Sequence, residues 1–150
     1  MVAYGMVLLG EIPTGALADM LGKKKTIMLS LAFVALGNAI MAFAPSYEYL
    51  LLSVIAMAVG GALASGTYEA LVYDSLLTSN KEHTFDRVQG RISAIKMASQ
   101  GVAAILGGFT YSYWTGLPFL LVSCASIMGV IVSLFLKEPP IDSVVFSFKN

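Results

Sequence analysis

The chain has 150 residues, of which 57% are hydrophobic and only 12% are charged, and its mean hydropathy is +0.80. Because so few polar side chains cannot cover the surface of a water-soluble core, this composition excludes an ordinary soluble domain and predicts a protein embedded in the lipid bilayer. Nine basic residues balance nine acidic residues, and most of the basic ones flank apolar stretches, which argues against nucleic-acid binding.

Five apolar stretches follow one another along the chain, and each is close to the roughly 20 residues that a helix needs to cross a bilayer. They predict membrane spans over residues 2–21, 26–43, 49–77, 88–113 and 117–136. The sequence does not show the short segments of alternating polarity that a membrane-spanning barrel requires. It therefore predicts an all-α, polytopic transmembrane helix bundle over residues 1–137, with a cytoplasmic tail or truncated linker over 138–150.

The charges and aromatic rings near the ends of the predicted spans indicate an orientation. Residues 44–48 and 114–116 contain no lysine or arginine, whereas the first connection, and the third with its flanks, contain Lys23, Lys24, Lys25, Lys81, Arg87 and Arg91. Since basic loops stay in the cytoplasm, five spans put the start of the chain outside and its tail inside a plasma (inner) membrane. Aromatic residues collect at the opposite membrane interface: Tyr47, Tyr49, Tyr111, Tyr113 and Trp114. A start outside, with no flanking sequence, also predicts that the chain is part of a longer protein.

The junction of the first two predicted spans, from Gly15 to Lys25, carries the most specific pattern. Gly15 and Gly22 permit a close helix approach and a tight turn. The carboxylate of Asp19 lies at the inner end of a membrane helix, where it costs free energy unless it meets a cation, a helix N-terminus or water. A solvated turn that follows the positive-inside rule is the alternative interpretation of the same residues.

This junction resembles a signature of the major facilitator superfamily of membrane transporters. The signature has six fixed positions: glycine, then after three residues aspartate, a basic residue, and after one residue glycine and two basic residues. Five of the six are matched here, by Gly15, Asp19, Gly22, Lys23 and Lys24, while Met20 stands where a basic residue is usual. The resemblance implies that the chain corresponds to helices two to six of a twelve-helix transporter that moves a small solute by alternating access between two halves. It further implies that Asp19 docks on the missing half, which is then the main protein partner.

Two carboxylates near the inner end of the third predicted span, Glu69 and Asp74, are candidate partners for this motif. The resemblance implies an ion pair between Lys23 or Lys24 and one of them, which would hold a cytoplasmic gate closed. Simple hydration at the membrane interface is the alternative for both carboxylates.

Two further charged residues lie inside predicted spans. Glu11 precedes Pro13, which kinks a helix, so it is expected either to line a central cavity, where it could couple transport to a proton or another ion, or to pair with a neighbouring polar group for structure. Lys96 is expected to extend its long side chain to the lipid headgroups. Neither position identifies a substrate.

No catalytic constellation is visible, because His83 and Cys124 each stand without a partnered nucleophile or metal ligand, and the sequence predicts no enzyme, metal site or cofactor. Small residues at helical spacing predict close packing of two neighbouring helices, one with Ala56, Gly60 and Ala64, the other with Ser99, Ala103 and Gly107. The leading prediction is an incomplete transporter with export as the working direction. The alternative is a membrane remnant or scaffold that associates with other subunits through these small-residue faces.

Overall fold

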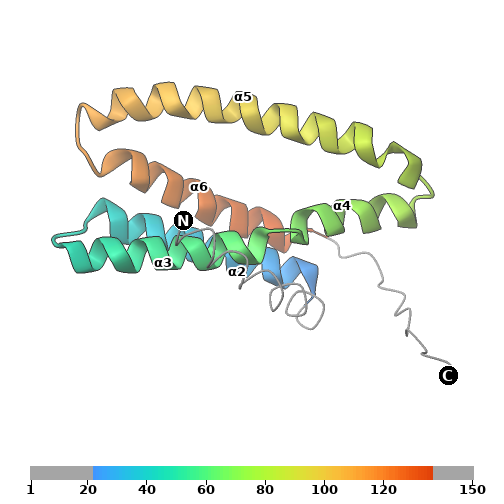
Figure 1. Cartoon of the computed structure of the whole chain (residues 1–150), viewed down its shortest axis with the longest axis horizontal. Coiled ribbons are helices and arrows are strands. Elements are labelled where there is room, and N and C mark those ends of the chain that lie inside the picture. Colours follow the sequence, from blue (N-terminus) through green and yellow to red (C-terminus); the bar gives the residue numbers. More distant parts are fainter. Residues whose placement is uncertain (1–21, 137–150) are drawn as a thin grey trace, which may run out of the picture.

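The computed structural model describes residues 22–136, and within this range the chain is helical apart from short turns. Figure 1 shows helices α2 (Lys23–Ala42), α3 (Tyr47–Ala64), α4 (Thr67–Thr78), α5 (Phe85–Tyr111) and α6 (Leu117–Leu134), with the single 3-10 turn η1 (Glu82–Thr84) before α5. The predicted all-α class is confirmed. The predicted span over residues 2–21, the tail over 138–150 and the candidate residues Glu11, Gly15 and Asp19 lie outside the described residues.

Four stretches of residues 22–136 are long and apolar enough to cross a membrane: Lys23–Ala42, Tyr47–Thr78, Glu82–Tyr111 and Leu117–Leu134. They correspond to the second to fifth predicted spans, with boundaries that differ by a few residues. The connections without basic residues lie together at the left of Figure 1, and α4 with η1 lies at the right. The basic and aromatic groups of the sequence therefore occupy opposite ends of one bundle.

The third predicted span, residues 49–77, is not one continuous helix. Ser65 has an extended ψ of 124° and Gly66 a φ of 74°, so the helix stops after Ala64 and starts again at Thr67. A positive φ is disfavoured for residues with a Cβ, and glycine adopts it without that penalty. Gly66 thus ends α3 and changes the direction in which α4 presents its side chains.

Helix α2 is the centre of the packing, because α3 and α6 both lie against it. Two glycines bring α2 and α3 close: a Cβ at Gly37 would lie 2.8 Å from the Ser53 carbonyl oxygen, and one at Gly60 would lie 2.8 Å from the Ser30 carbonyl oxygen. The hydroxyl of Ser30 donates to the Gly60 carbonyl at 2.7 Å. In a membrane, such close approach and interhelical hydrogen bonds replace the hydrophobic drive of water-soluble cores.

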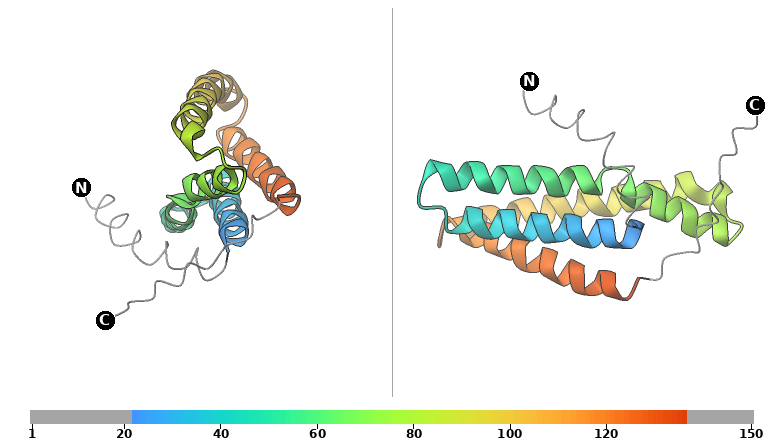
Figure 2. Two further views of the ribbon diagram at one scale, coloured as in Figure 1. Left: turned by 90° about the vertical axis from the view of Figure 1, so that its right-hand side faces the viewer. Right: turned by 90° about the horizontal axis from the view of Figure 1, so that it is seen from below.

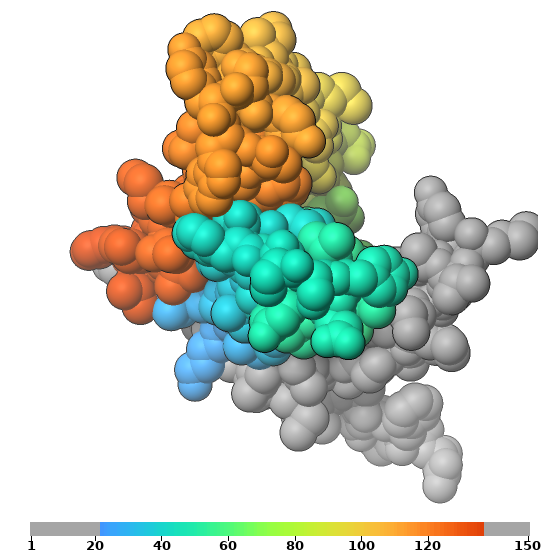
Figure 3. All heavy atoms as spheres, turned by 90° about the vertical axis from the view of Figure 1, so that its left-hand side faces the viewer, coloured from blue at the N-terminus to red at the C-terminus, as the bar shows by residue number. Residues whose placement is uncertain are grey.

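The predicted close packing is confirmed for the small-residue face of α3, but within residues 22–136 this face does not pack on that of α5. Gly60 packs on α2, while a Cβ at Gly107 of α5 would meet no atom within 4 Å. No residue of α5 is buried, and end-on views show α5 standing away from α2 and α3 (Figure 2, Figure 3). Small residues lower the steric cost of helix approach but do not choose the partner, and here the short turn after Ala42 brings α3 onto α2.

Candidate functional site

The turn before α2 is built around Gly22. Its φ of 90° lies in the left-handed region that favours glycine. Its carbonyl oxygen accepts hydrogen bonds from the backbone N–H of Thr26 at 3.1 Å and from the Thr26 hydroxyl at 3.0 Å. The motif glycine therefore sets the angle at which the chain enters α2, and with it the positions of the lysines that follow.

Lys23 forms an ion pair with Asp74, which joins the first turn of α2 to α4. The two side chains are 15% and 28% exposed, so water screens the pair only in part. An ion pair with this burial stabilises the contact by about 1–2 kcal/mol, between the values for exposed and for fully buried hydrogen-bonded charges. Of the lysine and carboxylate candidates in the sequence, the structure thus brings together Lys23 and Asp74.

Lys24 connects α2 to a different helix. Its ammonium donates to the backbone carbonyl of Leu134 at 2.7 Å, and Leu134 is the last residue of α6. The last four carbonyls of a helix have no partner within the helix, and a cation there also interacts favourably with the helix dipole. The neighbouring lysines therefore fasten α4 and α6 separately to the start of α2.

Glu69, the other candidate partner, faces α5 and is not paired with Lys23. Its Oε1 accepts a hydrogen bond from the side-chain amide of Gln89 at 3.2 Å. Glu69 and Asp74 are five residues apart, which is about 140° around a helix at 100° per residue. The two carboxylates therefore face different helices.

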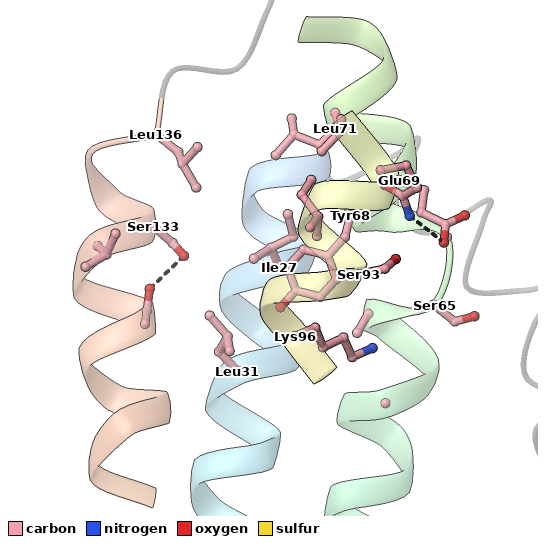
Figure 4. Close-up of a pocket in the computed structure, with 18 residues that line it drawn as sticks. Ile27, Leu31, Ser65, Tyr68, Glu69, Leu71, Ser93, Lys96, Ser133 and Leu136 are labelled. Carbon is pink, nitrogen blue, oxygen red and sulfur yellow. Dashed lines mark hydrogen bonds between the residues drawn. The ribbon is translucent and has the colours of Figure 1, made fainter. Parts of the chain in front are cut away.

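A cavity of about 1040 Å³ lies beside this end of the bundle, between α2, α5, α6 and the break between α3 and α4. Figure 4 shows Glu69, Ser93 and Lys96 along one wall of it. Much of the remaining lining is apolar and includes Ile27, Leu31, Leu71, Val132 and Leu136. Ligand pockets of proteins have this volume and this mixture of apolar surface with a few polar groups.

Lys96 lines this cavity and is an exposed residue of α5, and the extension of its side chain to the headgroups stays a prediction. It lies 11 residues after Phe85, the first residue of α5, which is about 16 Å along the helix axis. A charge deep in a membrane helix costs about 2.5–3.5 kcal/mol on insertion scales. Within residues 22–136, Lys96 has no ion-pair or hydrogen-bond partner.

Gln89 and Ser93, which were not predicted as site residues, also belong to this wall. With Lys96 they follow the spacing i, i+4 and i+7, which puts all three on one face of α5. This helical spacing of polar residues within an apolar span is the sequence pattern that could have predicted a polar face on α5. In the part of the chain that the structure describes, no group of three or more His, Cys, Asp or Glu side chains could hold a metal ion.

Comparison with known proteins gives one family. Residues 1–149 match the Major Facilitator Superfamily. The chain is 29% identical over 136 residues to the uncharacterized MFS-type transporter YxaM of Bacillus subtilis (strain 168), covering 90% of this chain and 33% of that protein. It is 25% identical over 143 residues to the lincomycin resistance protein LmrB of the same organism, covering 81% of this chain and 29% of that protein. The chain thus spans about a third of the length of these relatives, and no solved structure matches it significantly.

Proposed function

The chain belongs to the major facilitator superfamily, and from this membership we propose that the complete protein is a secondary transporter that moves a small solute by alternating access. The described helices form part of one half, and the other half is the partner against which they rock. The integral membrane location follows from the family and the apolar helices. The plasma membrane, with residue 1 outside and residue 150 in the cytoplasm, is our proposal from the distribution of basic residues.

The ion pair between Lys23 and Asp74 is the observation that most supports a role in the transport cycle. It connects the turn that carries the family signature to α4, at the end of the bundle where the basic residues gather. We assign it the role of a cytoplasmic gate contact, present when that side is closed and broken when it opens. Gly22 shapes the turn, and Lys24 holds α6 in place beside it.

The candidates outside the described residues keep their proposed roles. Gly15 permits close packing before the turn, and Asp19 docks on the missing half of the transporter. Glu11 lines the central cavity or couples transport to a proton or another ion.

Export is the proposed direction, supported by the relative that is named for lincomycin resistance. A small organic solute also fits the volume of the cavity. Whether lincomycin itself is a substrate is part of the test.

The experiment measures uptake of radiolabelled lincomycin, and of a panel of other small growth inhibitors, into inverted membrane vesicles that contain the full-length protein. We expect energised uptake of at least one compound above that of vesicles without the protein, and slower uptake with Asp74→Asn. The matched control is Asp86→Asn, which removes an exposed carboxylate of the first turn of α5. If no compound enters with the wild-type protein, the remnant or scaffold interpretation replaces this one.

A further inference from the structure

The cavity beside the gate contact has an asymmetric charge distribution. Glu69 lies at one end of its polar wall, where Gln89 donates a hydrogen bond to the carboxylate. Lys96 lies seven residues after Gln89 on the same face of α5, which is about 10 Å along the helix. Figure 4 shows this order, with Ser93 between the two charged side chains.

The two charged side chains differ in their hydrogen-bond partners. Glu69 accepts the hydrogen bond from Gln89, whereas Lys96 has no partner among residues 22–136. Seven residues of helix, about 10 Å, separate Gln89 from Lys96, and no ion pair joins Glu69 to Lys96. Among residues 22–136, Lys96 therefore contributes an unpaired positive charge to its part of the cavity.

The other walls of the cavity are suited to an apolar part of a ligand. Ile27 and Leu31 of α2 and Val132 of α6 line the cavity with Lys96. A ligand that places an anionic group at the ammonium and an apolar group against these side chains would satisfy both surfaces. A cationic ligand would have to compete with Gln89 for Glu69 and would be repelled by Lys96.

We propose that this cavity binds amphipathic organic anions, with the ammonium of Lys96 as the group that selects the negative charge. The proposal rests on the transporter function above and names the substrate class that this part of the protein accepts. An anionic lipid and a soluble organic carboxylate share the required chemistry, and the experiment separates them.

The experiment measures equilibrium binding to the purified full-length protein in neutral detergent, with three probes of similar size. These are 2-naphthoate, the neutral 2-naphthamide and the cationic 2-(aminomethyl)naphthalene. We expect 2-naphthoate to bind most tightly. Lys96→Gln should weaken its binding by about five- to tenfold, the effect of one partly screened charge, and should leave binding of 2-naphthamide unchanged.

Two variants serve as controls. Lys96→Arg keeps the positive charge and should keep the preference for 2-naphthoate. Lys81→Gln removes an exposed lysine from the turn before η1, away from the cavity, and should change no affinity. Competition by phosphatidylglycerol would identify a lipid as the natural source of the anion, and lack of competition would identify a soluble anion; either result supports the shared chemistry.

Three results would overturn the proposal. These are tighter binding of the cationic probe, equal weakening of 2-naphthoate and 2-naphthamide by Lys96→Gln, or no binding of any probe. Vesicle uptake separates this failure from failure of the proposed function, because a protein that transports solute but fails the binding test is still a transporter with a different substrate class.

Discussion

Breaking the ion pair between Lys23 and Asp74 should change transport more than it changes folding. The side chains are 15% and 28% exposed, so we estimate a contribution of about 1–2 kcal/mol to the state in which they touch. For a protein that alternates between two states of similar free energy, this shifts the equilibrium by about five- to thirtyfold. Either neutral variant, Lys23→Gln or Asp74→Asn, should therefore slow net transport while membrane insertion stays normal.

A double-mutant cycle isolates the interaction of the two residues. Because each single variant already removes the pair, the double variant should lose little more than one single variant, and the charge swap Lys23→Asp with Asp74→Lys should recover part of the rate. Initial uptake rates in vesicles with the full-length protein provide the measurement, with Asp86→Asn and Lys81→Gln as controls. The difference between wild type and variants should also shrink at high salt. Strictly additive effects of the two substitutions would refute the pairing and return Asp74 to a hydrated residue at a helix end.

Three further predictions concern packing and orientation. Gly60→Ala should destabilise the detergent-solubilised full-length protein by about 1–3 kcal/mol in thermal unfolding, because the new Cβ would lie 2.8 Å from the Ser30 carbonyl oxygen. The control Gly61→Ala, whose Cβ would meet no atom within 4 Å, should be neutral or stabilising. Equal effects of the two substitutions would contradict the packing of α3 on α2. Gly66→Ala should lower the free energy of unfolding by about 1–2 kcal/mol in the same assay, because alanine is strained at a φ of 74°. The new Cβ would meet no atom within 4 Å, so a steric clash adds nothing. An unchanged unfolding temperature would argue against the break between α3 and α4. In a Cys124→Ser background, Lys24→Cys and His83→Cys should react with an impermeant maleimide from the cytoplasm, and Ser46→Cys should react from outside. Labelling of Lys24→Cys and Ser46→Cys from the same side would disprove the proposed orientation.

The helices of the structure could be predicted because hydropathy over about 20 residues is a strong signal in a membrane, where backbone groups must be satisfied within the helix. The break at Gly66 was not predicted. A glycine inside an apolar run is compatible with a continuous helix, and only the φ of 74° shows that this one ends α3. The partner of Gly60 was likewise hidden, since small residues permit close approach to any neighbouring helix.

The candidate site shows the same division between what is local and what depends on the fold. The resemblance to the family, together with the position of these charges at one end of the predicted bundle, limited the ion pair to two lysines and two carboxylates. It could not choose between Glu69 and Asp74, since that choice depends on the direction of α4 after Gly66. The spacing of Gln89, Ser93 and Lys96 puts them on one face of α5, but that this face lines the cavity depends on how α5 packs beside α4 and α6.

The gate is tested most directly by the accessibility of the cavity from the cytoplasm. A cysteine at Ser93, in the full-length protein with Cys124→Ser, lies in the cavity wall and can be labelled with an impermeant maleimide in inverted vesicles. If the pair of Lys23 and Asp74 holds the cytoplasmic side of a transporter closed, adding Asp74→Asn should raise the labelling rate, by about twofold when the two states are equally populated in the wild type and by up to about thirtyfold when the closed state dominates. Equal labelling rates with and without Asp74→Asn would contradict the gate and the alternating-access account built on it.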